Sequence, residues 1–229
     1  MNVPFPPIML ILSWRCSAHM LGRTAAKQRK PIQTKRFSAL QGGIFSDLRA
    51  ESAQTLAALD FPGYAIGGLS VGESKADMLR TISEVNQILP ENKPRYLMGV
   101  GTPQDLIEGV LRGVDIFDCV LPTRLARHNS AMTLTGRMNL MNAAYARDER
   151  SIDADCQCYT CQHFSRAYLR HLVNAKEMLA ATLLSIHNLY TLVNLTQRMR
   201  QAILAGEMQR FAQETLAAIA ASQTVEEEV

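Results

Sequence analysis

The sequence predicts an α/β fold built on parallel strands. Three times between residues 47 and 121, a segment with helical spacing of apolar residues leads into a short apolar run. Such alternation is typical of parallel strands covered by helices, either in a doubly wound sheet or in a (β/α)₈ barrel. In both architectures the chemistry is located at the carboxyl ends of the strands. With 229 residues, 47% of them apolar, the chain can form one large domain or a domain with an accessory module.

The first two units follow each other directly along the chain. Residues 47–59 have an amphipathic pattern and precede the apolar run 64–69, which predicts a buried strand ending in glycines. Residues 73–89 have helical spacing and stop at Pro90, and residues 95–101 predict the next strand.

The third unit has a helix start and a helix stop signal. Thr102-Pro103 begins a helix that runs through Leu111, Gly113 ends it, and residues 115–121 predict a short apolar strand. Three such units are less than half of a barrel of about 250 residues. If the fold is a barrel, the alternating part is therefore incomplete.

The rhythm changes after Pro122. Residues 131–140 form two short alternating runs around Thr135-Gly136, which predicts an inserted hairpin. The last third of the chain has helical spacing and ends in the acidic residues 226–228, which predict a solvated tail.

Charge is distributed unevenly along the chain. Seven basic residues precede the first acid, Asp47, so a net charge of +3 leaves residues 47–229 with −4. Affinity for nucleic acid must therefore come from local clusters. An acid-free, arginine-containing start also resembles a mitochondrial transit peptide, but three prolines within residues 4–7 interrupt any helix there. We therefore expect a cytoplasmic protein.

Hydropathy and cysteine usage exclude two classes of protein. No run reaches the roughly 18 to 20 apolar residues that cross a bilayer, and the best candidate, Ile8–Trp14, stops at Arg15. We expect no membrane partner. Of five cysteines, three lie between residues 156 and 161, unlike the spread pairs of secreted disulfide proteins. This crowding predicts a bound metal.

The motif Cys156-x-Cys158-x-x-Cys161, followed by His187, has the donors of a structural zinc site. Three thiolates and one imidazole saturate a tetrahedral Zn²⁺ and leave no position for a catalytic water. Sulfur ligands disfavour magnesium and calcium. The alternative is three unrelated buried cysteines, which rarely bunch so tightly.

Three histidines are candidates for the fourth ligand. His163 lies so close to Cys161 that closing a tetrahedron would strain the chain, and His171 sits within a helical pattern. Spacing alone favours His187.

Asp118 is the candidate nucleophile. It ends an apolar strand in the motif Phe117-Asp-Cys-Val-Leu-Pro-Thr-Arg124, with Arg127 close behind. A carboxylate there suits a nucleophile or an electrostatic stabiliser, and the arginines suit phosphate binding. The alternative is an aspartate that caps the following loop. The neighbouring Cys119 has no histidine near it in sequence, which predicts a buried core thiol.

Together these motifs resemble the tRNA-guanine transglycosylases, over about residues 41–211. The resemblance rests on five motifs in order, which are Gln41-Gly-Gly43, Tyr64-Ala-Ile-Gly-Gly-Leu-Ser-Val-Gly-Glu73, Arg95-Tyr-Leu-Met-Gly-Val-Gly-Thr-Pro103, Phe117-Asp-Cys-Val-Leu-Pro-Thr-Arg124, and the three cysteines with His187. It implies the carboxyl-terminal part of a (β/α)₈ TIM barrel with an inserted hairpin, a zinc-binding subdomain and C-terminal helices.

The resemblance also implies roles for single residues. Asp118 would be the nucleophile, and Gln41, Gly68 and Leu69 would contact the purine-like base. Cys156, Cys158, Cys161 and His187 would hold one structural zinc per chain. The residues matching the parts that touch RNA are Gly99, Val100, Gly101, Thr102, Pro103, Gln104 and Asp105, and Thr123, Arg124, Leu125, Ala126 and Arg127.

The implied reaction exchanges the wobble guanine of tRNA with a GUN anticodon for a 7-deazaguanine, through a covalent ribosyl-aspartate, in queuosine biosynthesis. Val71 stands where eukaryotic relatives tend to carry glycine, so the resemblance implies the bacterial base, 7-aminomethyl-7-deazaguanine. The family also implies a homodimer.

The chain departs from the family pattern at its start. Relatives have a longer N-terminal half with the first barrel strands, a Ser-Gly-Gly-Phe motif preceded by a general acid/base aspartate, and a second aspartate that reads the base. None of these occurs here. We therefore expect a truncated or frame-disrupted relative that is inactive alone. The alternative is a non-catalytic zinc-bearing module that binds RNA or pairs subunits.

We expect four segments along the chain. They are an atypical basic segment (residues 1–40), a partial barrel (41–150), a zinc-binding subdomain (151–204), and a C-terminal helix with an acidic tail (205–229).

Overall fold

The computed structural model describes residues 10–11 and 37–227, with side chains from 37 to 222. Most of the basic segment expected over residues 1–40, including its prolines and most of the run Ile8–Trp14, lies outside the described residues. The chain forms two compact units. The first unit comprises residues 1–119 and 200–209, and the second comprises 120–199 and 210–229.

The first unit contains a five-stranded sheet with the order β1-β5-β4-β3-β2. Neighbours from β2 to β5 are parallel, and β1 pairs with β5 in the antiparallel sense. The strands are β1 (Leu10–Ile11), β2 (Ser38–Leu40), β3 (Tyr64–Ile66), β4 (Arg95–Leu97) and β5 (Ile116–Phe117). The predicted α/β fold with a parallel sheet is therefore confirmed.

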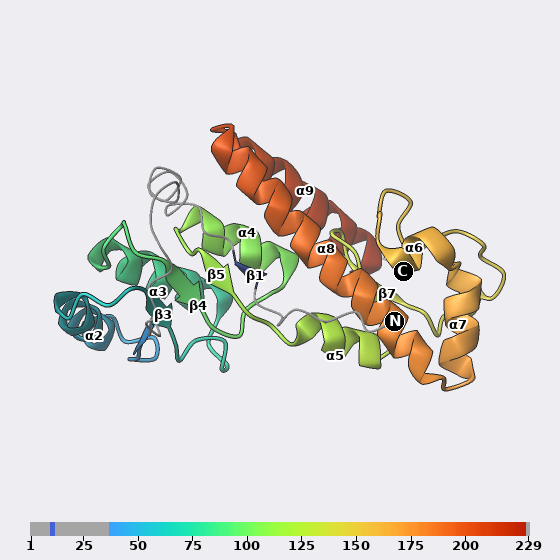
Figure 1. The fold of residues 1–229 in the computed structure, drawn as a ribbon, viewed down its shortest axis with the longest axis horizontal. Helices are drawn as coiled ribbons and strands as arrows, with labels where there is room; N and C mark the ends of the chain where they lie inside the picture. The colour runs from blue at the N-terminus through green and yellow to red at the C-terminus, as the bar shows by residue number, and fades with distance from the viewer. Residues whose placement is uncertain (1–9, 12–36, 228–229) are drawn as a thin grey trace, which may run out of the picture. The chain divides into compact units, whose positions relative to one another are not determined.

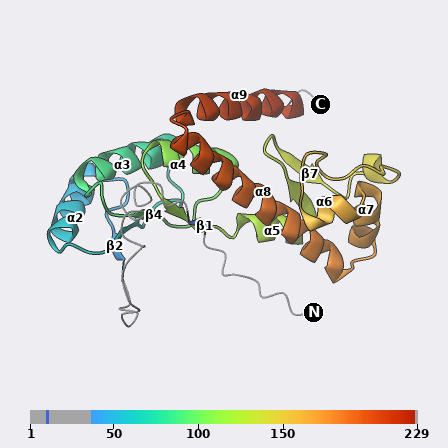
Figure 2. The same ribbon diagram turned by 45° about the horizontal axis from the view of Figure 1, so that its top comes forward.

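Three helices connect the parallel strands in turn. They are α2 (Ser46–Ala58), α3 (Lys75–Ile88) and α4 (Pro103–Leu111). Right-handed crossovers between successive neighbours put the helices on one face of a sheet, and α2, α3 and α4 lie together along the strands in Figures 1 and 2. The core between these layers is apolar and buried, with Leu40, Ile66, Ile82, Leu97, Leu106 and Phe117.

Local signals explain where the helices begin. Ser74 caps α3, because its side chain accepts a hydrogen bond from the backbone N–H of Asp77 at 3.1 Å. Thr102 caps α4 in the same way through Asp105, and Pro103 occupies the first turn. The helices expected over 73–89 and 102–111 are confirmed within two residues at each end.

The strands are shorter than the sequence predicts. The strand expected over residues 115–121 ends at Phe117, and Leu121 instead begins a helix, α5 (Leu121–Arg127), with Pro122 in its first turn. At β3 and β4 the expected strands end early because Gly68 and Gly99 take φ values of +64° and +73°, which leave the strand geometry.

The second unit combines a hairpin with helices. β6 (Ser130–Met132) and β7 (Arg137–Asn139) pair in the antiparallel sense, which confirms the predicted hairpin. The remaining elements are η1 (Ala143–Tyr145), α6 (Tyr159–His163), α7 (Arg166–Asn174), α8 (Met178–Leu204) and α9 (Met208–Glu227). The backbone of the expected acidic tail is helical as far as Glu227, and its side chains lie outside the described residues.

The core of the second unit is formed by residues from its helices and from the hairpin. Its buried members include Ala126 from α5, Leu140 after β7, Leu169 from α7 and Leu184 from α8. By length and composition alone, α8 is apolar enough to cross a membrane. Its buried side includes polar residues hydrogen-bonded within this unit, as a core helix does.

Candidate metal centre and candidate active site

Cys156, Cys158, Cys161 and His187 converge in the second unit. Their four ligand atoms all lie within 4.8 Å of one another. The imidazole Nδ1 of His187 lies 3.6, 3.5 and 3.3 Å from the sulfur atoms of Cys156, Cys158 and Cys161. The four residues expected to bind zinc are thus brought together.

These distances fit a tetrahedral site with sulfur and nitrogen donors. With Zn–S of about 2.3 Å and Zn–N of about 2.0–2.1 Å, each sulfur of a tetrahedral site lies about 3.6 Å from the nitrogen. The cluster can hold a metal ion, and its soft donors are compatible with zinc. His163, the alternative ligand, lies outside the cluster and packs its ring against Tyr159 at 4.7 Å.

Hydrogen bonds orient the cluster. Nε2 of His187 lies 2.9 Å from the carbonyl oxygen of Met132, and since a carbonyl only accepts, Nε2 carries the proton. The lone pair of Nδ1 therefore faces the sulfur atoms. Cys158 stands at the N-terminus of α6, where its sulfur accepts from the backbone N–H of Cys161 at 3.3 Å. Partners of this kind fix ligand geometry in metal sites.

The three thiols differ in acidity. The hydrogen bond from the Cys161 thiol lowers the pKa of Cys158 to about 3, against the opposing effect of burial. Burial raises the pKa of Cys156 to about 11. The hydrogen bond with Cys158, and then burial, also raise the pKa of Cys161. A metal binds cysteine as the thiolate, so metal binding releases the proton of each thiol that still carries one.

Asp118 follows β5 in the first unit and is half-buried. Its Oδ1 accepts hydrogen bonds from the Tyr96 hydroxyl at 2.6 Å and from the Gly99 backbone N–H at 2.9 Å. Its Oδ2 accepts no hydrogen bond from the described residues. Only one of the two carboxylate oxygens is thus anchored, by β4 and the loop that follows it.

The pKa of Tyr96 depends on its burial and on the Asp118 carboxylate. Burial, followed by the hydrogen bond to Asp118 and its negative charge, raises the pKa of Tyr96 to about 12. The phenol therefore stays protonated and donates to Oδ1 throughout the neutral range. Cys119, expected to be buried, is instead half-buried, because the chain leaves the sheet at this point. Its side chain packs against Gly101, where an added Cβ would lie 2.3 Å from the Cβ of Cys119.

Gln41 and the glycine pair that follows β3 meet in the first unit. A Cβ built on Gly67 would lie 2.7 Å from Nε2 of Gln41, and one built on Gly68 would lie 2.8 Å from its Oε1. The carboxamide of Gln41 therefore rests against bare backbone, which only glycine permits. Leu69, beside the pair, is buried.

The loop after the glycine pair is held by Glu73. Its carboxylate accepts from the backbone N–H groups of Ser70 and Val71. Burial alone would raise the pKa of Glu73, but these hydrogen bonds outweigh it and lower the pKa. Val71 itself is exposed at the loop tip.

The segment expected to touch RNA after β4 is partly engaged within the protein. Thr102 and Asp105 bond to each other, and Asp105 also pairs with Lys75. Gly99 is exposed, whereas Val100 is buried. Within residues 99–105, the exposed turn at Gly99 is therefore the part open to a ligand.

The second expected RNA segment lies on α5 in the second unit. Leu125 and Ala126 are buried in the core, whereas Arg124 and Arg127 are exposed. The two arginines are three residues apart, so they share a helix face. Neither forms an ion pair with the described residues.

The family model of queuine tRNA-ribosyltransferase matches residues 12–221. The chain belongs to this family. The resemblance seen in the sequence is thereby confirmed.

Relatives named queuine tRNA-ribosyltransferase are highly similar. Those from Pediococcus pentosaceus and Moorella thermoacetica are 55% and 57% identical over 81% and 77% of this chain. One from Streptococcus equi subsp. equi is 54% identical over 82% of the chain. The aligned parts are 49%, 47% and 50% of those relatives, so the chain spans about half the length of the curated relatives it matches.

The sequence does not predict the roles of two buried polar residues, Asn188 and Arg49. The buried Asn188 accepts from the backbone N–H of Met132 at 2.7 Å and donates to the carbonyls of Pro122 and Ser130 at 2.9 and 3.1 Å. Arg49 is buried beside Gln41 and the glycine pair. In the sequence, each is marked only as a polar residue within a helix, α2 for Arg49 and α8 for Asn188.

Proposed function

We propose that this chain carries the nucleophile and part of the base site of a tRNA-guanine transglycosylase. The reaction replaces the wobble guanine of tRNA with a GUN anticodon by 7-aminomethyl-7-deazaguanine, in queuosine biosynthesis. The observation that carries the proposal is Asp118, whose Oδ1 is held by Tyr96 and Gly99 while Oδ2 has no donor among the described residues. Family membership supplies the reaction class.

Asp118 acts as the nucleophile. Its Oδ2 forms a bond to the anomeric carbon of the nucleotide, the bond from that carbon to N9 of guanine breaks, and guanine leaves with a proton from a general acid. The incoming base then gives up its proton and displaces the aspartate, so two inversions retain the configuration. The nucleotide must leave the anticodon stack to reach the carboxylate.

The purine base binds to Gln41 and the glycine pair. A carboxamide both donates and accepts hydrogen bonds, as the edge of a purine requires. The absence of side chains at Gly67 and Gly68 makes room for the Gln41 carboxamide against the main chain, where it can meet a purine edge. Val71 at the exposed loop tip suits the bacterial base.

The sheet of the first unit is part of a (β/α)₈ barrel. Strands β2, β3, β4 and β5 are neighbours in chain order, without the reversal found in doubly wound sheets. Asp118 and Gly68 each follow a strand at its carboxyl end, where barrel enzymes place their chemistry.

Zinc is the metal held by Cys156, Cys158, Cys161 and His187, one per chain. Four protein ligands leave no position for a reacting water, so the ion is structural. It ties α6 and α8 to each other, and through His187 and Met132 it supports β6. Arg124 and Arg127 bind phosphates that flank the wobble nucleotide.

A second candidate function is a module that pairs subunits or binds RNA without catalysis. Tyr159, His163, Phe164 and Tyr168 form a chain of ring contacts beside the cysteine cluster, and Tyr159 and Tyr168 are exposed. Exposed aromatic groups of this kind are typical of interfaces between proteins. A homodimer formed through this surface, in the cytoplasm and away from membranes, fits both candidates.

The test supplies the family's N-terminal half as a separate polypeptide from the Moorella relative. The unsubstituted chain should form a covalent adduct with a GUN-anticodon tRNA that survives denaturing electrophoresis. Asp118→Asn should lose it, whereas Asp60→Asn, at an exposed turn, should keep it. An adduct with Asp118→Asn would remove Asp118 from this role, and tRNA binding without any adduct would favour the second candidate.

A further inference from the structure

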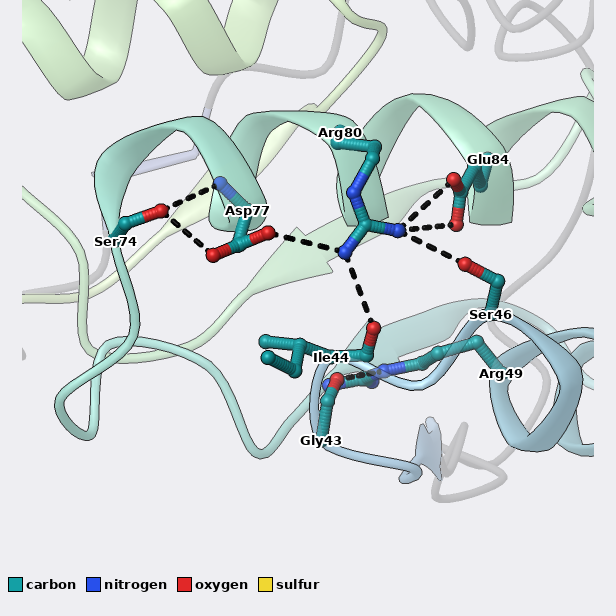
Figure 3. Close-up of polar contacts among 8 residues, drawn as sticks. All are labelled: Gly43, Ile44, Ser46, Arg49, Ser74, Asp77, Arg80 and Glu84. Atoms are coloured by element: carbon teal, nitrogen blue, oxygen red, sulfur yellow. Dashed lines mark hydrogen bonds and ion pairs between the residues drawn. The ribbon is translucent and has the colours of Figure 1, made fainter.

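Arg49 is a cation buried beneath the candidate base site. It lies on α2 and is 1% exposed. Its Nε donates to the carbonyl of Gly43 at 2.7 Å and its Nη2 donates to the carbonyl of Gly68 at 3.2 Å. Its Nη1 lies 3.5 Å from the carbonyl of Leu40. Figure 3 shows the side chain reaching Gly43.

These carbonyls belong to the two segments that carry the base contacts. Leu40 and Gly43 flank Gln41, and Gly68 is the second glycine of the pair. Gly43 and Gly68 have φ values of +57° and +64°, a left-handed conformation that favours glycine. Glycine therefore supplies the backbone conformation at two of the three carbonyls that the guanidinium contacts.

The two segments also bond to each other at the same place. The backbone N–H of Gly67 donates to the carbonyl of Leu40 at 3.1 Å. The carboxamide of Gln41 rests on the glycine pair above this contact. Arg49 therefore donates hydrogen bonds to both segments where they meet, to Gly43 in one and to Gly68 in the other.

Two effects act on the charge of Arg49. Burial lowers the pKa of Arg49, and the negative charge of Glu73 opposes this shift. Burying a cation is unfavourable unless the cation is paired or hydrogen-bonded, and the donors of Arg49 face three carbonyl oxygens. Arginine supplies donors in a rigid planar fork, whereas lysine supplies a compact point charge.

We propose that Arg49 is a positioning residue, which fixes the Gln41 carboxamide and the Gly68 backbone relative to each other so that both meet one purine edge. This inference rests on the proposed function. It names a residue that touches no substrate but determines how firmly the base is held.

Arg80 offers a matched control. It lies on α3, donates to the carbonyl of Ile44 at 3.2 Å and to the hydroxyl of Ser46 at 2.9 Å, and pairs with Asp77 and Glu84 (Figure 3). It supports the same loop after Gln41 from the solvent side. None of its hydrogen bonds or ion pairs involves the glycine pair.

The first measurement is amide hydrogen exchange of the 229-residue chain, which needs no ligand. In Arg49→Lys, exchange should rise about tenfold or more in both segments 40–45 and 67–71, because charge-assisted hydrogen bonds to each are lost. In Arg80→Lys, only the segment 43–46 should change. Unchanged exchange over 67–71 in Arg49→Lys would overturn the positioning role.

The second measurement is equilibrium dialysis of the same proteins with labelled guanine, each supplied with the N-terminal half of the Moorella relative. Arg49→Lys should weaken binding about tenfold while keeping the zinc content of the unsubstituted chain, and Arg80→Lys should bind as the unsubstituted chain does. Equal affinities for the two variants would overturn the proposal. If the unsubstituted chain binds no guanine, the proposed function is contradicted, and the exchange result decides on Arg49. Arg49→Gln replaces the lysine variant if that protein does not fold.

Discussion

Nε2 of His187 donates to the carbonyl oxygen of Met132, 2.9 Å away. The backbone N–H of Met132 in turn donates to Asn188, the next residue of α8. One residue of β6 is thus held on both backbone polar groups by two successive residues of one helix. Because His187 also faces the three sulfur atoms, the metal cluster and the hairpin stabilise each other.

Removing a ligand should release the metal. We expect Cys158→Ala and His187→Ala to lower bound zinc from about one ion per chain to near zero, because three remaining donors do not close a structural site. His163→Ala, whose ring lies outside the cluster, should keep its zinc. Elemental analysis of the purified proteins measures this. Full zinc in His187→Ala together with loss in His163→Ala would refute the ligand assignment.

Asn188 should matter for stability more than its neighbours on α8. Asn188→Ala leaves the Met132 N–H and two carbonyls without their partner inside the core, and we expect a loss of about 2–4 kcal/mol in unfolding free energy. Gln197→Ala, at an exposed position of the same helix, should change it by less than about 0.5 kcal/mol. Urea denaturation compares the two, and equal effects would contradict the role given to Asn188.

The parts of the fold that the sequence predicts are those with local signals. Apolar periodicity, the Ser74 and Thr102 caps and the Thr135-Gly136 turn each act within a few residues, and the corresponding helices and hairpin are present. Helix α5 was missed because seven residues beginning at Leu121 hold too few turns to show a period.

Long-range partners explain what the sequence did not predict in the site. Asn188 and its hydrogen-bond partner Met132 are 56 residues apart, and Arg49 and Gly68 are 19 apart. Both use backbone carbonyls or N–H groups, which every residue has, so no sequence pattern marks them. The three cysteines were predictable because thiols at metal-ligand spacing are rare.

Tyr96 should ionise late because of its surroundings. A phenol whose pKa rises to about 12 on folding stabilises the protein below its unfolded value near 10, and this contribution is lost as the pH rises through 12. Near-ultraviolet absorbance titration should show one tyrosine ionising about two pH units after the exposed ones, and Tyr96→Phe should remove it. In Asp118→Asn the late ionisation should move partly toward 10, since burial remains. A Tyr96 that titrates normally would contradict both its burial and its hydrogen bond, and an unchanged late ionisation in Asp118→Asn would contradict the hydrogen bond alone.

Arg124 and Arg127 should act on RNA through charge. Replacing either by Gln should weaken binding to an anticodon stem-loop and reduce the slope of log affinity against log salt by about 0.7–0.9, since each phosphate contact releases counterions. Arg198→Gln, whose guanidinium packs over Phe211, should leave the slope unchanged. Equal slopes for all three variants would mean that α5 does not touch phosphates.

The last prediction is that the 229-residue chain alone does not exchange guanine in tRNA at a measurable rate. Departure of guanine needs a proton at N9, and general acid/base groups contribute about 10²- to 10⁴-fold. The resemblance to the family implies that the general acid/base is an aspartate that precedes a Ser-Gly-Gly-Phe motif. The 229 residues do not contain that motif.

The placement of Gln41 is a second reason to expect no exchange by the chain alone. The sheet ends at β2, so no further strand of this sheet stands beside Gln41 among the described residues to hold its loop. Productive catalytic geometry requires placement within roughly 0.5 Å. The assay measures incorporation of labelled guanine into tRNA, with the Moorella relative as positive control. Turnover by the chain alone near that of the control would show that another residue of these 229 transfers the proton, and that Asp118 and Gln41 are placed well enough without further strands.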